Sequence, residues 1–213
     1  MSFNKFGHKG ELLAIKKFHF LLNYLYKDGI KEYEKGVNKK KIGNYKKSSI
    51  ISWVEFNIQP TPLSIEYKIL IVYIQGYNPY AYILNPSLNE LKKENMSIPH
   101  LYDHDRYRLC LHYPYTNDYN FDEEIGKQYV PWIKHWLYYF EEWIYSEKWK
   151  GGGVEPGDEI DRELNYNYKK DKNNKLKENI SREIFNAVDE ANKIYDKRLK
   201  ILLEVGTNDK INA

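Results

Sequence analysis

The chain has 213 residues, of which 42% are apolar and 30% charged, so it is long enough to bury a core as one domain with appendages or as two small domains. Lysine and arginine number 33 against 30 aspartates and glutamates, a formal net charge of +3, and this near balance argues against a dedicated nucleic-acid-binding protein. The single cysteine excludes an internal disulfide and a cysteine-rich zinc site.

The N-terminal segment predicts an amphipathic helix over residues 9–26, which Asp28-Gly29 ends. Apolar side chains recur at steps of three and four and so share one face: Leu12, Ile15, Phe18, Leu22 and Leu25. The residues before it lack the apolar run of a signal peptide, and no stretch approaches the roughly 20 apolar residues of a membrane span. We therefore expect a soluble, cytoplasmic protein with no membrane partner.

A lysine-rich segment follows over residues 27–47. Gly36 and Gly43 interrupt it, which disfavours a continuous rigid helix. We interpret the segment as a solvated basic loop, with a docking patch as the alternative.

Three strands are predicted next, over residues 50–58, 65–74 and 80–84. They are rich in β-branched and aromatic residues and are separated by proline-containing turns. The second is apolar on both faces towards its end, as a covered central strand would be. Because the connections are short, we expect an antiparallel β-meander rather than parallel crossovers.

A polar loop is expected over residues 89–99, and two further helices are expected beyond residue 129. The first covers residues 130–149, with Pro131 in its first turn and Gly151-Gly152-Gly153 as its stop. The second covers 176–203, where the stripe is Leu176, Ile180, Ile184, Ala187, Ala191, Ile194, Arg198 and Leu202. It packs on the domain or pairs with a partner. We expect a linker before it and a frayed end over 206–213, which divides the chain into a domain of residues 1–155 and a linker plus helix of 156–213.

The densest chemistry lies between residues 99 and 112, around Cys110. A thiolate is a nucleophile when it is partly exposed and lies near positive charge or hydrogen-bond donors, and His104, Arg106, Arg108 and His112 are close in sequence. The alternative is a buried cysteine on a short strand that serves only as a small apolar side chain.

Other chemistries remain open on the residues alone. His100, His104 and His112 with Asp103 and Asp105 could supply metal ligands, although the His-Glu-x-x-His pattern is absent. A Cys-His hydrolase would need an oriented histidine base. Tyrosine, tryptophan and lysine could bind single-stranded nucleic acid, but tryptophans at helical spacing, such as Trp132, Trp136 and Trp143, are typical of a core.

The order of these elements resembles the ubiquitin-conjugating enzyme fold: a helix, a β-meander, a Tyr-x-Pro turn, a histidine ten residues before a cysteine, and C-terminal helices. More closely, the chain is similar to the conjugating-enzyme-like proteins of bacterial antiviral CBASS operons, over about residues 10–155. The segments that carry the likeness are Tyr77-Asn78-Pro79, Pro99-His100-Leu101-Tyr102, Leu109-Cys110-Leu111, Pro131-Trp132 with Trp136-Leu137 and Phe140-Glu141, and Trp149-x-Gly151-Gly152.

The resemblance implies an α+β protein that acts as a cysteine acyltransferase. Cys110 would hold the C-terminus of a partner protein as a thioester, and the partner would be a cyclic GMP-AMP synthase-like nucleotidyltransferase that is thereby modified or primed. His100 is expected to organise the loop rather than act as a base, and His112 is a further candidate for proton transfer because it would share a strand face with Cys110. Tyr102 occupies the family's oxyanion-donor asparagine position, and its hydroxyl could donate there.

Two alternatives to the acyltransferase function remain open. No cofactor or metal ion is expected. Another protein would have to activate the acyl group, or the partner's C-terminus would have to be handled without such a step. A catalytically inert binding protein of the same fold is one alternative function, and a single-stranded nucleic-acid-binding protein is another. Substitution of Cys110 by alanine separates the first alternative from catalysis.

Overall fold

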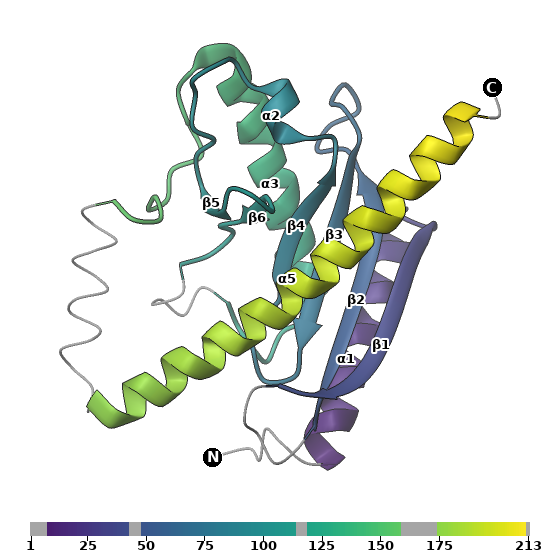
Figure 1. The fold of residues 1–213 in the computed structure, drawn as a ribbon, viewed down its shortest axis with the longest axis vertical. Coiled ribbons are helices and arrows are strands. Elements are labelled where there is room, and N and C mark those ends of the chain that lie inside the picture. The colour runs from purple at the N-terminus through teal and green to yellow at the C-terminus, as the bar shows by residue number, and fades with distance from the viewer. Residues whose placement is uncertain (1–7, 43–47, 114–118, 159–173, 212–213) are drawn as a thin grey trace.

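The computed structural model describes residues 8–42, 48–113, 119–158 and 174–211. Its elements, shown in Figure 1, are α1 (His8–Lys27), β1 (Tyr33–Lys41), β2 (Ser48–Ile58), β3 (Tyr67–Ile74), β4 (Tyr80–Asn85), α2 (Leu88–Leu91), β5 (Leu101–Asp103), β6 (Arg108–Leu109), α3 (Ile125–Ser146) and α5 (Asn174–Ile211). Within the described residues the strands form one six-stranded sheet of order β1-β2-β3-β4-β6-β5, antiparallel at every pairing. The predicted α+β class and the antiparallel meander of β2, β3 and β4 are confirmed.

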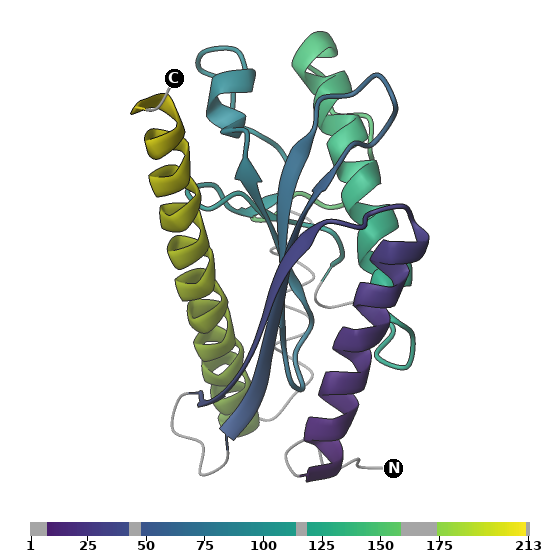
Figure 2. The same ribbon diagram turned by 90° about the vertical axis from the view of Figure 1, so that its right-hand side faces the viewer.

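Helices cover both faces of the sheet, as Figure 2 shows edge-on: α1 and α3 lie on one face and α5 lies on the other. Because side chains alternate between the faces of a strand, β3 contributes to two cores. Ile69 and Ile71 pack with α1 and α3, whereas Leu70 and Val72 pack beneath α5. The prediction that this strand is covered on both faces is confirmed.

Helix α1 has the predicted extent but a slightly different buried face. Ala14, Phe18, Leu21 and Leu25 are buried, whereas two residues of the expected face, Leu12 and Ile15, are 55% and 46% exposed. Both the predicted and the observed set of residues recur with helical spacing, so the spacing alone does not decide which set is buried. Packing against α3 and the sheet decides it.

The prediction of a loop over residues 27–47 is wrong in its central part, because β1 pairs with β2 along Tyr33–Lys41. β1 is an edge strand, where exposed lysines are common because they oppose pairing with another chain. Its lysines also find acids on neighbouring helices: Lys39 Nζ lies 2.8 Å from Glu11 and Lys40 Nζ lies 2.7 Å from Glu190. Residues 43–47 lie outside the described residues.

Helix α3 begins and ends earlier than the sequence predicts. It starts at Ile125, so Pro131 lies inside the helix rather than in its first turn. The residues before the proline, including Ile125, Tyr129 and Val130, are buried, and this burial offsets the backbone hydrogen bond that proline removes. The helix ends at Ser146, its C-cap residue Glu147 has a left-handed φ of 57°, and the three glycines follow beyond this end.

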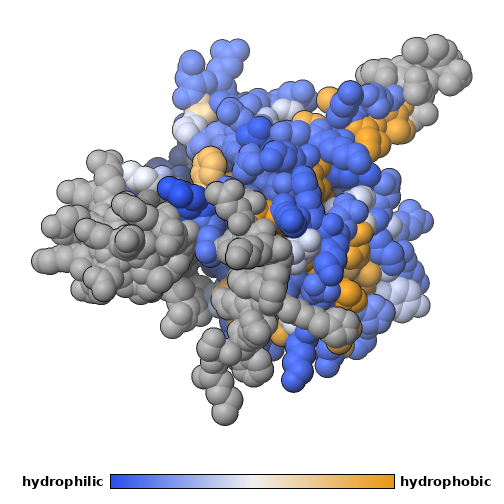
Figure 3. Space-filling view, turned by 60° about the horizontal axis from the view of Figure 1, so that its bottom comes forward, coloured by the Kyte–Doolittle hydropathy of each residue, from blue (hydrophilic) through white to orange (hydrophobic). Residues whose placement is uncertain are grey.

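Helix α5 spans Asn174–Ile211 and is longer than the predicted 176–203, because it continues past residue 206, where a frayed end was expected. It packs on the sheet through Ala187, Ala191 and Tyr195, while Ile184 is 49% exposed. The linker residues 159–173 and the side chains of residues 176 and 180 lie outside the described residues. The face in Figure 3 is mostly hydrophilic, with apolar surface near the C-terminal end of α5. Among the described helices, none is both long and apolar enough to cross a bilayer.

Candidate functional site around Cys110

A short hairpin brings His100 and Cys110 together. β5 and β6 pair antiparallel, with Leu101 opposite Leu109, so the residues flanking this pair meet at the end of the hairpin. The Cys110 N–H donates to the His100 carbonyl oxygen at 3.0 Å. The ten residues from His100 to Cys110 therefore form a hairpin whose two ends lie side by side.

The carbonyl of His100 also ties this turn to α3. The Trp136 indole N–H donates to the same oxygen at 3.0 Å, and this hydrogen bond is buried. His100 has a φ of 54°, in the left-handed region that non-glycine residues rarely occupy. The backbone on either side of Cys110 is thus held by a specific main-chain geometry and by a helix side chain.

The N–H and side chain of His100 contact the segment after α3. Its N–H donates to both oxygens of Glu155, at 3.0 and 2.8 Å, and its Nε2 lies 3.4 Å from Glu155 Oε2. Its ring packs on Trp149 with centroids 4.7 Å apart. Burial lowers the pKa of His100 below its usual value, while the charges of Glu155 and Asp158 oppose that shift.

Cys110 lines a cavity of about 400 Å³ between the hairpin, α3 and the glycine segment. The residue is half-buried, so the alternative of a fully buried structural cysteine is wrong. The other lining residues are His100, Leu111, His112, Tyr113, Trp132, His135, Trp136, Tyr139, Trp149, Gly151, Gly152, Gly153 and Val154. The expected acyl-carrying sulfur is therefore on a residue that borders a concave site.

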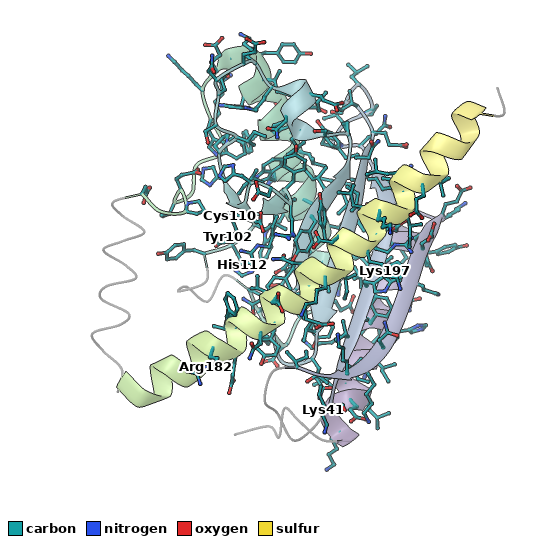
Figure 4. The ribbon with its side chains drawn as sticks, viewed as in Figure 1. Lys41, Tyr102, Cys110, His112, Arg182 and Lys197 are labelled. Carbon is teal, nitrogen blue, oxygen red and sulfur yellow. The ribbon has the colours of Figure 1, made fainter. Side chains whose placement is uncertain are left out.

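Tyr102 lies beside this site, and its hydroxyl supports the segment after Cys110. The hydroxyl donates to the His112 carbonyl oxygen at 2.8 Å, and the Arg108 guanidinium lies 5.4 Å from its ring centroid. Tyr102 is not among the residues that line the cavity. Figure 4 shows Tyr102, Cys110 and His112 gathered at one edge of the sheet.

His112 lies beyond the strand on which it was expected, because β6 ends at Leu109, yet it lines the same cavity as Cys110. Its Nε2 lies 3.0 Å from the Tyr129 hydroxyl, which donates its own proton to the Pro79 carbonyl at 2.6 Å. Burial raises the pKa of Tyr129 well above its usual value, so the hydroxyl stays protonated. It must then accept from His112, which assigns a proton to Nε2.

The geometry of the described residues does not favour a metal site or base stacking by the buried tryptophans. Within the described ranges, no group of three or more histidine, cysteine, aspartate or glutamate side chains could hold a metal ion. His104 and Asp105 are exposed in the turn between β5 and β6, away from the cavity lining. Trp136 and Trp143 are buried in the core and are not available for stacking on bases.

The second wall of the site was not predicted from the sequence. Glu155, which accepts from the His100 N–H, lies at the end of the predicted domain of residues 1–155 and had no predicted part in the site, and the three glycines were predicted only as a helix stop. The signal that could have found them is Trp149-x-Gly151-Gly152, which was noted as part of the resemblance but not assigned to the site. The short hairpin that joins His100 to Cys110 was also not predicted.

Together these features define an α+β protein with a partly buried cysteine in the wall of a largely aromatic cavity. A comparison with protein families matches residues 34–156 to the family described as Type II CBASS E2 protein. This match covers more than half of the chain, which therefore belongs to that family, and the membership indicates an E2-like role in CBASS defence. A search of curated proteins finds no match.

Proposed function

We propose that this protein has a ubiquitin-conjugating-like fold and acts as a conjugating-type acyl carrier in antiviral defence. The observation that carries the proposal is the position of Cys110, which is half-buried at the wall of a cavity beside an ordered turn. A cysteine in a dry core could not accept a polypeptide tail. A cysteine on a flat surface would lack a groove to orient one.

The proposed reaction has two acyl-transfer steps. The Cys110 thiolate attacks the C-terminal carbonyl of a partner protein that arrives as an acyl adenylate or a thioester. A carbon–sulfur bond forms, and AMP or the carrier thiol leaves. An amine then attacks the Cys110 thioester, an amide forms, the amine loses a proton, and the Cys110 thiol is released.

Two hydrogen-bond donors near the Cys110 sulfur already donate to acceptors within the protein. The Cys110 N–H donates to His100, and the Tyr102 hydroxyl donates to His112. We therefore propose Tyr102 as a positioning residue that holds the backbone after Cys110, instead of the direct oxyanion donor inferred from the family pattern. Its phenylalanine variant should lower the rate of acylation without changing the reactivity of Cys110 towards iodoacetamide.

His100 is proposed to organise the site through its backbone. Its carbonyl accepts two hydrogen bonds, its N–H donates to Glu155, and its ring is buried against Trp149. These contacts support a structural role for His100 at the site. The partner proposed for the reaction is the C-terminal tail of a CBASS nucleotidyltransferase, which the family context supports.

Phage protection in cells tests this proposal against an inert binding protein. Cells carrying the full operon with Cys110→Ala should lose protection, while the variant protein should still co-purify with the nucleotidyltransferase. Full protection by Cys110→Ala would reject the acyl-carrier function and leave a binding role. Lys197→Ala, an exposed change on α5, is the control and should protect like the wild type.

A further inference from the structure

The cavity beside Cys110 has a mainly aromatic lining that includes the imidazoles of His100, His112 and His135. Trp132, Tyr139 and Trp149 supply ring surface, and its lining contains no carboxylate, ammonium or guanidinium group. A charged side chain entering this cavity would lose hydration, and the lining offers it no carboxylate, ammonium or guanidinium partner. An apolar side chain would gain by leaving water.

The wall formed by residues 151–153 is built for close packing against these rings. A Cβ at Gly151 would lie 2.8 Å from Tyr139 Cδ2, and one at Gly153 would lie 3.3 Å from His100 Cε1. Gly152 and Gly153 have φ values of 65° and 87°, and the Trp149 indole N–H donates to the Gly152 carbonyl at 3.1 Å. The cavity is thus preformed by backbone that only glycine suits.

The occupant follows from the position of Cys110 in the lining. An acyl group on its sulfur begins inside the cavity, so the residues next to that carbonyl must lie in or along it. The volume of about 400 Å³ falls within the range of roughly 300–1,000 Å³ that is usual for ligand sites. An extended chain advances about 3.3 Å per residue, so only the last few residues of the tail lie within reach.

We infer that this cavity is a subsite for a bulky apolar side chain within the last three residues of the acyl donor's C-terminal tail. The inference rests on the proposed acyl-carrier function and adds the chemical class of the tail. It separates this protein from a carrier that accepts any unhindered, glycine-rich tail.

Synthetic peptide thioesters test the inference on the full chain. Six-residue peptides carry Gly, Phe, Leu or Glu in turn at each of the last three positions, and intact mass follows acyl transfer to Cys110 as the small thiol leaves. At one position at least, Phe or Leu should raise the rate about tenfold over Gly, and Glu should lower it. Tyr139→Ala should abolish this preference, and Trp132→Ala is a second variant in case the first does not fold.

The controls separate recognition from reactivity. Tyr145→Ala lies on the same helix, 85% exposed, and should keep the preference, while iodoacetamide should alkylate Cys110 equally in all variants. Equal rates for all peptides, or a preference that survives both cavity variants, would overturn the inference and leave the acyl-carrier function standing. Protection of Cys110 from alkylation by a nucleotide but by no peptide would also overturn it. If iodoacetamide alkylates Cys110 but neither the peptides nor the partner's tail acylates it, the acyl-carrier function itself is rejected.

Discussion

Residue 100 acts on the site chiefly through its main chain. Its carbonyl accepts from the Cys110 N–H and from the Trp136 indole, and its N–H donates to Glu155. His100 thus links the Cys110 backbone, α3 and the segment after α3, and these contacts fix the backbone direction at Cys110. Reaction rates depend steeply on such placement, because an ångström of displacement at a reacting atom is costly.

Removing the Trp136 hydrogen bond should therefore slow acylation more than it destabilises the fold. Trp136→Phe keeps an aromatic ring but loses the N–H, and the His100 carbonyl keeps its second donor. We expect a loss of about 1 kcal/mol in unfolding free energy and a fall of about tenfold in the rate of thioester formation. Urea unfolding and intact-mass kinetics measure the two effects. An unchanged rate in a folded variant would show that this tie does not position Cys110.

The lowered pKa of His100 makes stability depend on pH in a defined direction. Burial disfavours the imidazolium in the folded state, so below the unfolded-state pKa of about 6.5 the unfolded chain binds more protons. Stability from this residue is present above pH 6.5 and is lost as the pH falls towards the folded-state pKa. His100→Asn tolerates the left-handed backbone and should lose less stability than the wild type between pH 7.5 and pH 5.5. Equal losses of unfolding free energy in the two proteins, measured by urea unfolding, would contradict the assignment of this pH dependence to His100.

At the scale of elements, the strands with a clear apolar pattern were predicted from the sequence. The strand that depends mainly on pairing with its neighbour was not. β2, β3 and β4 carry alternating or continuous apolar runs and were predicted. β1 has nine residues with four lysines and one glycine and carries no apolar pattern, because an edge strand is held by β2 and by acids on other elements. The start of α3 was missed because Pro131 suggested a first turn, while the burial of Ile125 and Tyr129 depends on tertiary contacts.

The contact between α5 and the sheet depends on Arg198. Its Nε donates to Glu55 at 2.7 Å, its Nη2 pairs with Glu34, and its guanidinium lies 4.4 Å from the centroid of the Trp53 ring. Glu55 is 4% exposed, with Lys68 as its other cation at 3.6 Å. Loss of Arg198 would therefore leave a buried carboxylate with one weaker partner.

Arg198→Ala should destabilise the protein by about 3 kcal/mol, because breaking a buried pair strands a charge. The adjacent Lys197, labelled in Figure 4, is exposed, and its alanine variant should change stability by less than about 0.5 kcal/mol. Urea unfolding measures both. Similar small effects in the two variants would show that α5 does not depend on this ion pair.

Two glycines should respond to alanine with opposite signs. A Cβ at Gly36 in β1 would lie 2.5 Å from Trp53 Nε1, whereas one at Gly206 in α5 would meet nothing within 4 Å. Gly36→Ala should cost about 1–3 kcal/mol through overpacking, and Gly206→Ala should add up to about 1 kcal/mol through helix propensity. Thermal unfolding compares them. A neutral Gly36→Ala would mean that the Trp53 ring moves aside without cost.

At the scale of the molecule, the concave site beside Cys110 lies at the open end of the β5–β6 hairpin. The sequence predicted the pair His100 and Cys110 through their spacing, together with the family to which the chain belongs. It did not predict the aromatic cavity, because its walls come from α3 and from residues 149–154, which are brought together only by folding. Glu155 was missed for the same reason.

The central claim is that Cys110 carries a partner's C-terminus, and intact mass after co-expression with the nucleotidyltransferase and the other proteins of the operon tests it most directly. The wild type should show an adduct with the mass of the partner that thiols remove, because a thioester exchanges with thiols. Cys110→Ser should show an oxyester adduct that thiols leave in place, and Cys110→Ala should show none. An adduct that persists in Cys110→Ala, or its absence from both the wild type and Cys110→Ser while the two proteins still bind, would contradict the account.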